Sequence, residues 1–139
     1  MAIFTNSALS DRIMRSGVSE RIRKLVRDVA ASVFTSGSSE LTASGAVPAG
    51  TQLVELNHAT VAVAATMAPP TGGGLVVIKD TSASGTAAHT LTLTSGTLNA
   101  TGNNKATLNA SKECLIVYFD SNGNGNVVEN LGSVALSTV

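Results

Sequence analysis

Few residues in this chain could do chemistry, and only one segment has the spacing of a ligand set. In Asp120-Ser-Asn-Gly-Asn-Gly-Asn126 the side-chain oxygens occupy the first, third and fifth positions and a glycine the sixth, as in a calcium-binding loop. The twelfth position is Leu131, where that loop needs a bidentate glutamate, and no pair of helices flanks the segment. Because Asn-Gly is also the strongest signal for a hairpin turn, we expect a turn, with calcium binding as the alternative.

The histidines and the cysteine do not extend this set. His58 and His89 have no Cys, His or Asp at metal-ligand spacing, and we expect them at the surface or at an interface. Cys114 opens the apolar run Cys114–Phe119, where a thiol behaves as a small hydrophobe. No Gly-x-Ser-x-Gly motif is present, and the glycines at 72–74 precede a predicted strand, whereas phosphate loops follow one. The sequence therefore predicts no enzyme and no metal, cofactor or small-molecule substrate.

The composition favours a component of an assembly. Charged residues make up 13 % of the 139 residues, whereas about 25 % is usual. Three Phe, one Tyr and no Trp leave a thin core, and one cysteine cannot form an internal disulfide. Small domains without disulfides or metals gain burial by oligomerisation. No apolar run approaches the ~20 residues of a membrane span, so we expect synthesis in a cytoplasm and no membrane partner.

Residues 1–35 are predicted to form an amphipathic helical arm. Apolar residues recur at helical spacing, at Val18, Ile22, Leu25, Val26, Val29 and Val33. The segment 1–35 holds six basic and three acidic residues, and the remainder holds three basic and six acidic. A helix of about 15 residues is marginal alone in water, so we expect it to dock in an acidic or apolar protein groove. A solvated face and nucleic-acid binding are the alternatives, the latter disfavoured by the narrow basic patch and the lack of aromatic residues.

After the arm we expect a Ser/Gly linker over 36–50 and a single β domain over 51–139. In the β domain the apolar period changes to two, which predicts eight short strands at 52–56, 60–66, 75–79, 90–94, 105–109, 114–119, 126–129 and 133–136. The strands at 75–79 and 114–119 are apolar on both faces and should be central, whereas 90–94 has one Thr face and one Leu face. The predicted fold is mainly β, a sandwich, β-barrel or jelly roll of antiparallel strands.

Four motifs between Leu75 and Ser137 form a recognisable series. They are an apolar strand ending in Ile-Lys-Asp-Thr-Ser, the strand His-Thr-Leu-Thr-Leu-Thr-Ser-Gly, a Gly-Asn-Asn…Ala-Thr-Leu hairpin, and the closing Glu-Asn-Leu-Gly-Ser-Val-Ala-Leu-Ser. The series covers about 60 of the 139 residues. It resembles a module of virion proteins of tailed bacteriophages, and most of all the small capsid decoration, or cement, proteins.

The resemblance implies a homotrimer of β-barrel or jelly-roll subunits, made in the host cytoplasm and bound to the major capsid protein on the outer capsid surface. It offers no catalytic residues. We expect trimer contacts at Leu91, Leu93, Val127 and Leu136. We expect capsid or subunit contacts from the arm at Arg21, Ile22, Arg23, Leu25, Val26, Arg27 and Val29.

Two rival functions remain open. A head- or tail-fibre module that binds a host receptor or glycan would use similar strands, but it would need exposed aromatic residues or polar clusters on the loops. We expect the only tyrosine, Tyr118, to be buried. A polysaccharide depolymerase would need paired carboxylates in a groove. The acidic residues of the β domain are scattered along the sequence, so this second rival is the weaker one.

Overall fold

The computed structural model describes residues 37–85 and 87–139. The predicted helical arm, and with it the expected contact residues from Arg21 to Val29, lie outside the described residues. The predicted eight-strand pattern can be compared with the structure throughout the β domain, and the mainly β class is confirmed.

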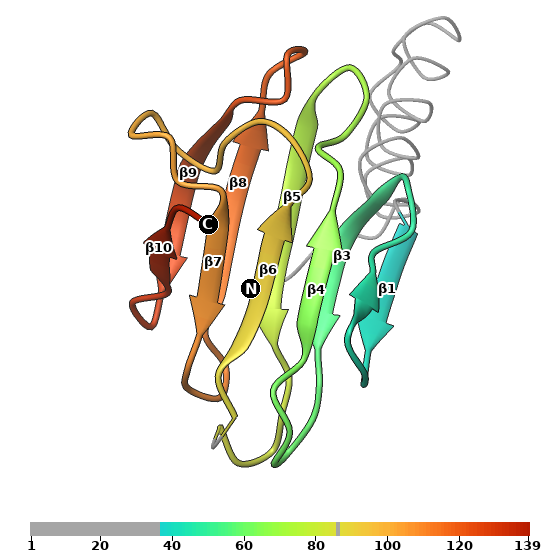
Figure 1. Cartoon of the computed structure of the whole chain (residues 1–139), viewed down its shortest axis with the longest axis vertical. Helices are drawn as coiled ribbons and strands as arrows, with labels where there is room; N and C mark the ends of the chain where they lie inside the picture. The colour runs from blue at the N-terminus through green and yellow to red at the C-terminus, as the bar shows by residue number, and fades with distance from the viewer. Residues whose placement is uncertain (1–36, 86) are drawn as a thin grey trace, which may run out of the picture. The chain divides into compact units, whose positions relative to one another are not determined.

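Ten strands make up the described part of the chain, and no helix occurs in it (Figure 1). In chain order they are β1 (Gly37–Leu41), β2 (Gly45–Ala46), β3 (Thr51–Leu56), β4 (Ala64–Met67), β5 (Gly74–Asp80), β6 (His89–Leu93), β7 (Lys105–Leu108), β8 (Cys114–Phe119), β9 (Gly125–Leu131) and β10 (Ala135–Ser137). The later eight correspond to the eight predicted strands, with ends that differ by up to four residues.

The strands form two five-stranded sheets around one core. Sheet A has the order β1-β3-β5-β8-β9, and sheet B has the order β10-β7-β6-β4-β2. From β1 to β6 the chain alternates between the sheets, so that β1, β3 and β5 pair in parallel in sheet A and β2, β4 and β6 pair in parallel in sheet B. The remaining pairs are antiparallel. The expectation of an all-antiparallel barrel or jelly roll is therefore wrong, and the sheets are mixed.

The segment expected to be a linker is part of the fold. Residues 37–50 contain β1 and β2, and both Leu41 and Val47 are buried in the core. The sequence does not reveal β1, because Gly-Ser-Ser-Glu-Leu has one apolar residue, which is too few to show a period of two. Parallel pairing with the more apolar β3 supplies the hydrogen bonds that hold β1 in the sheet.

The core lies between the inner faces of the two sheets. Val76, Ile78, Leu115, Val117 and Phe119 reach it from β5 and β8, and all five are completely buried. The predicted central position of these two strands is confirmed, because each has a strand on both sides. The predicted half-burial of 90–94 is confirmed as well. Leu91 and Leu93 point into the core, and Thr90 and Thr92, which alternate with them, lie on the outer face.

Candidate functional site

The outer face of sheet A carries a group of apolar side chains beside the charged residues Glu40, Glu55, Lys79 and Glu129. Side chains alternate along each strand, so the residues between the buried ones share the outer face, and the register places Leu53 of β3, Val77 of β5 and Ile116 of β8 side by side across the sheet. Leu75 and Tyr118 form the adjacent pair on one side, and Cys114 pairs with Leu131 on the other. We call these seven residues the apolar face.

Three members of the apolar face are large and exposed. Leu75 is 46 % exposed, Tyr118 52 % and Leu131 51 %. The expectation that Tyr118 is buried is wrong, because the alternation that buries Phe119 turns its neighbour outward. Single exposed hydrophobic residues are common, whereas a contiguous set on one sheet face makes that face the candidate interaction surface.

The outer face of sheet B has a different character. Strand alternation and register place Thr66, Thr90, Thr92 and Thr107 there, together with Lys105. These threonines are exposed or half-buried and carry no large apolar group. Of the two outer sheet faces, only that of sheet A would therefore bury a substantial apolar area when a partner covers it.

Two of the expected trimer residues are inaccessible to a second subunit. Leu91 is 0 % exposed and Leu93 is 3 % exposed, because both point from β6 into the subunit core. Val127 and Leu136 are partly buried and pack against the same core from the edge strands β9 and β10. The assignment of Leu91 and Leu93 to a trimer interface is corrected accordingly.

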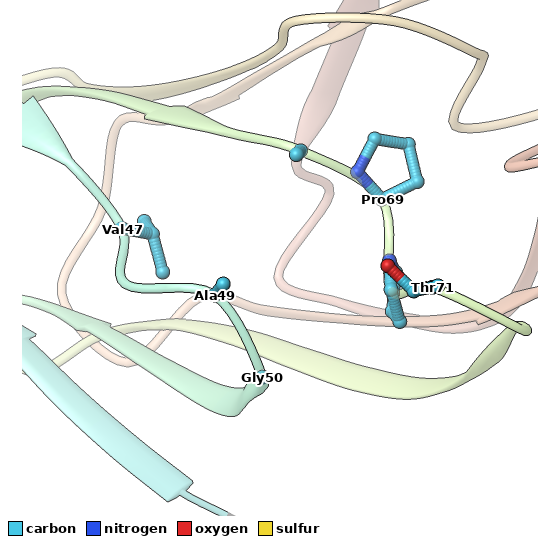
Figure 2. A pocket seen from close by; sticks show the side chains of 7 residues that line it. Val47, Ala49, Gly50, Pro69 and Thr71 are labelled. Atoms are coloured by element: carbon cyan, nitrogen blue, oxygen red, sulfur yellow. The ribbon is translucent and has the colours of Figure 1, made fainter.

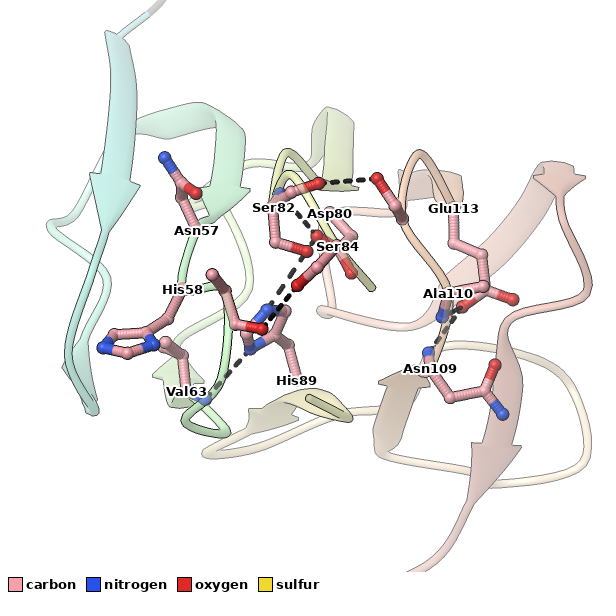
Figure 3. Close-up of polar contacts among 12 residues, drawn as sticks. Asn57, His58, Val63, Asp80, Ser82, Ser84, His89, Asn109, Ala110 and Glu113 are labelled. Atoms are coloured by element: carbon pink, nitrogen blue, oxygen red, sulfur yellow. Dashed lines mark hydrogen bonds and ion pairs between the residues drawn. The ribbon is translucent and has the colours of Figure 1, made fainter. Parts of the chain in front are cut away.

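A cluster of polar side chains lies buried where β5 ends and β6 begins (Figure 3). Asp80, Ser82 and His89 are each at most 2 % exposed. His89 Nδ1 accepts a hydrogen bond from the Val63 backbone N–H at 3.0 Å, and Asp80 Oδ1 accepts one from the Ser82 N–H at 2.7 Å. His89 Nε2 lies 3.9 Å from Asp80 Oδ1. The expectation of a surface or interface position for His89 is therefore wrong.

The cluster combines Ser, His and Asp, but it lacks the arrangement of a nucleophilic triad. A general base needs a free imidazole nitrogen to take the serine proton. In His89, Nδ1 already accepts the Val63 N–H, so the proton of the neutral ring is on Nε2 and points towards Asp80. Neither nitrogen is available to Ser82, and no substrate could reach the buried side chains. The same tautomer prevents Nε2 from binding a metal while the Val63 hydrogen bond is kept.

The other polar side chains of the described residues mostly hold turns. Glu113 Oε2 accepts the N–H groups of Asn109 and Ala110 in the β7–β8 turn, at 2.6 and 3.1 Å. The Asn130 side chain bonds both the N–H and the carbonyl of Val134 between β9 and β10. In the described part of the chain, no group of three or more His, Cys, Asp or Glu residues has the arrangement of a metal site.

The segment that resembles a calcium loop is a hairpin turn between β8 and β9. Asp120 Oδ1 accepts the N–H groups of Asn122 at 2.8 Å and Asn124 at 2.9 Å. The hydrogen bond from the Asn124 backbone is the main cause that lowers the pKa of Asp120. Because the carboxylate is directed at its own loop, the prediction of a turn is confirmed. His58 likewise stabilises the loop after β3, where its Nδ1 accepts hydrogen bonds from the N–H groups of Thr60 and Val61.

A small pocket opens between two loops near β2 and β4. It has a volume of about 110 Å³ and is lined by Val47, Ala49, Gly50, Ala68, Pro69, Pro70 and Thr71 (Figure 2). The volume suits one aliphatic side chain, and the lining provides no charged group. No helix among the described residues is long and apolar enough to cross a membrane.

Comparison with protein-family models finds no match to this chain, and comparison with curated proteins finds none either.

Proposed function

We propose that the chain is a non-enzymatic virion structural protein of a tailed bacteriophage. It is made in the host cytoplasm, forms a homotrimer, and decorates and stabilises the assembled capsid by binding the major capsid protein on the outer surface. The observation that carries the proposal is the apolar face of sheet A, where Leu75, Tyr118 and Leu131 stand exposed on a rigid sheet. In an assembly, a neighbouring protein covers such an apolar surface, and its burial stabilises the contact.

The composition and the fold support the same function. The chain is poor in charge, and its two sheets enclose one core of modest size. Two mixed sheets around one core form a small, mainly β subunit, the class that the sequence resemblance implies, although the parallel pairs among β1 to β6 do not follow the jelly-roll order. A protein that binds only the assembled shell stabilises it by mass action, by about 2.7 kcal/mol per site at a hundredfold excess over Kd.

Capsid binding is the direct test. Undecorated capsids, assembled from the major capsid protein encoded in the same genome, are mixed with the purified chain, pelleted and melted. We expect saturable co-sedimentation and a higher melting temperature of the shell, together with a trimer mass by light scattering. Tyr118→Ser should weaken assembly, whereas Thr92→Ser on the outer face of sheet B should not. A monomer that never pellets with shells would overturn the proposal.

A fibre module that binds a host receptor or glycan is the second candidate. The exposure of Tyr118 favours it, because aromatic side chains stack on sugar rings and this one is 52 % exposed. A glycan array probed with the wild type and with Tyr118→Ser separates the two functions. Binding to a defined glycan that is lost in the variant would support the fibre module, and absence of binding would support decoration.

A further inference from the structure

We propose that Asn122, at the tip of the β8–β9 turn, is a site of spontaneous deamidation, and that its conversion loosens this turn. The reaction needs water and no enzyme or cofactor. The site does not depend on the proposed capsid function, because it is built entirely from the residues of one turn and the loop beside it.

The β8–β9 turn contains two Asn-Gly pairs, Asn122-Gly123 and Asn124-Gly125. In such a pair the backbone nitrogen of the glycine attacks the side-chain carbonyl carbon, Cγ, of the asparagine, because glycine has no Cβ to block the approach. The new N–Cγ bond closes a cyclic imide, and the side-chain nitrogen leaves as ammonia with the proton of the glycine nitrogen. Water then opens the imide at either carbonyl and yields aspartate or isoaspartate.

The side chain of Asn122 is free to react. Asn122 is exposed, and its side-chain amide makes no hydrogen bond to any residue that the structure describes. The attacking nitrogen belongs to Gly123, whose N–H donates to the Asp120 carbonyl within the same turn at 3.1 Å. Both residues of the pair lie outside β8 and β9. Rotation of the Asn122 side chain and movement of the turn tip therefore bring Cγ to the nitrogen while the hydrogen bonds between the strands are kept.

Hydrogen bonds hold the second pair in place. The Asn124 N–H donates to Asp120 Oδ1 at 2.9 Å, and the Asn124 side-chain Nδ2 donates to Asp120 Oδ2 at 3.4 Å. Gly125 is the first residue of β9, and its N–H donates to the Thr97 carbonyl in the loop after β6 at 2.7 Å. Attack by the Gly125 nitrogen must break these bonds, so the fold protects Asn124.

The packing of the two glycines differs in the same direction. A Cβ atom at Gly125 would lie 2.7 Å from the Thr97 carbonyl oxygen and 2.8 Å from the Leu98 carbonyl oxygen. At Gly123 the nearest atoms to an added Cβ are side-chain carbons of Pro69 at 3.2 Å. Gly123 therefore has more room to move towards the asparagine that precedes it.

Conversion of Asn122 weakens the turn through charge and through backbone length. Either product adds a carboxylate next to that of Asp120, which accepts the N–H of residue 122 at 2.8 Å, and like charges repel. Isoaspartate also inserts a CH2 group into the backbone before Gly123. This displaces the Gly123 N–H from the Asp120 carbonyl, and it displaces the Gly123 carbonyl from the Thr97 N–H, 3.3 Å away. The turn then loses its attachment to the loop after β6.

Ageing of the purified full chain tests the site. The protein is kept in a mildly alkaline buffer, sampled over time and digested with a protease that cleaves after glutamate, which releases residues 114–129. Mass spectrometry with fragmentation locates each conversion, since a carboxyl group is heavier than an amide. We expect Asn122 to convert about tenfold faster than Asn124, because reaction at Asn124 must first break the additional hydrogen bonds.

Two controls separate the fold from the sequence. In concentrated urea neither glycine is held, and we expect both asparagines to convert at similar rates. Asn122→Gln should abolish conversion at the turn tip, whereas Asn126→Gln is the matched control, because Asn126 is also exposed but precedes Val127. After ageing, the free energy of unfolding should fall in the wild type and in Asn126→Gln, and it should stay unchanged in Asn122→Gln.

Each outcome decides one part of the proposal. Equal rates at Asn122 and Asn124 in the folded protein would overturn the site, as would conversion of Asn122 in urea alone. Conversion of Asn122 with no change in the free energy of unfolding would overturn the loosening of the turn. Faster conversion at Asn122, accompanied by a loss of stability that Asn122→Gln prevents, would support both parts.

Discussion

His89 Nε2 lies 3.9 Å from Asp80 Oδ1, and this contact joins the start of β6 in sheet B to the end of β5 in sheet A. Both side chains are completely buried. The separation is too long for a direct hydrogen bond, but the Nε2–H points its positive end at the carboxylate. The contact, with the Val63 hydrogen bond on the other ring nitrogen, orients the chain where it crosses between the sheets.

Replacing His89 should destabilise the fold. His89→Leu leaves the Val63 N–H buried without an acceptor, and we expect the free energy of unfolding to fall by about 1–3 kcal/mol. Urea denaturation at a fixed protein concentration measures the change. His58→Leu is the matched control, because the N–H groups of Thr60 and Val61 are exposed and can bond water instead. Equal losses in both variants would contradict the structural role of His89.

Substitution by alanine should lower the stability of the fold at Leu91 and the native mass at Leu75. Leu91→Ala creates a cavity in the core, and we expect a loss of about 2–5 kcal/mol in the free energy of unfolding. Leu75→Ala removes an exposed side chain and should change stability little but lower the native mass measured by light scattering. If Leu91→Ala instead dissociated the proposed oligomer and left the fold fully stable, the placement of Leu91 in the core would be wrong.

A steric contrast between two glycines tests the packing of β9. A Cβ atom at Gly125 would lie 2.7 Å from the Thr97 carbonyl oxygen and 2.8 Å from the Leu98 carbonyl oxygen, whereas nothing lies within 4 Å of a Cβ atom at Gly45. We expect Gly125→Ala to cost about 1–3 kcal/mol of unfolding free energy, and Gly45→Ala to be nearly neutral. Thermal unfolding by circular dichroism compares the two, and similar melting temperatures would argue against the close approach of β9 to the loop after β6.

Acid should weaken the β8–β9 turn through Asp120. The folded turn lowers the pKa of this carboxyl, so the unfolded chain binds the proton more readily. The contribution to stability is therefore complete above the pKa of the unfolded chain and is lost as the pH falls through the folded pKa, from about pH 5 downward. Asp120→Asn keeps an acceptor but does not titrate, and it should remove this part of the acid dependence. A carboxyl carbon titration by NMR checks the sign, and a pKa above that of unfolded Asp would contradict it.

Side-chain periodicity predicts the class of the fold, most of its strands and the side chains that point into the core. The alternation in Thr90–Thr94 identified which side chains point inward, and the continuous apolar runs identified the central strands. Periodicity does not say which strands are neighbours, because parallel and antiparallel strands show the same alternation. The sequence therefore does not predict the parallel pairing among β1 to β6, nor the polar strand β1.

The proposed interaction surface could be predicted only in part from the sequence. An apolar stripe has the same sequence pattern whether it meets its own core or a partner, so the sequence does not distinguish these two roles for Leu91 and Leu93. The apolar face of sheet A depends on four strands, β3, β5, β8 and β9, and only their register brings Leu53, Val77 and Ile116 into one row. The pairing of Asp80 with His89 likewise depends on how the chain crosses between the sheets.

The alternating path of β1 to β6 has a consequence for synthesis. As the chain leaves the ribosome, β5 and β6 appear before the strands that cover their free edges, since β8 pairs with β5 and β7 pairs with β6. Pairings between strands distant in sequence form slowly, and uncovered strand edges are prone to aggregation. Translation must therefore proceed past Phe119 before both edges can be closed, and the nascent chain is most vulnerable to misassembly in that interval.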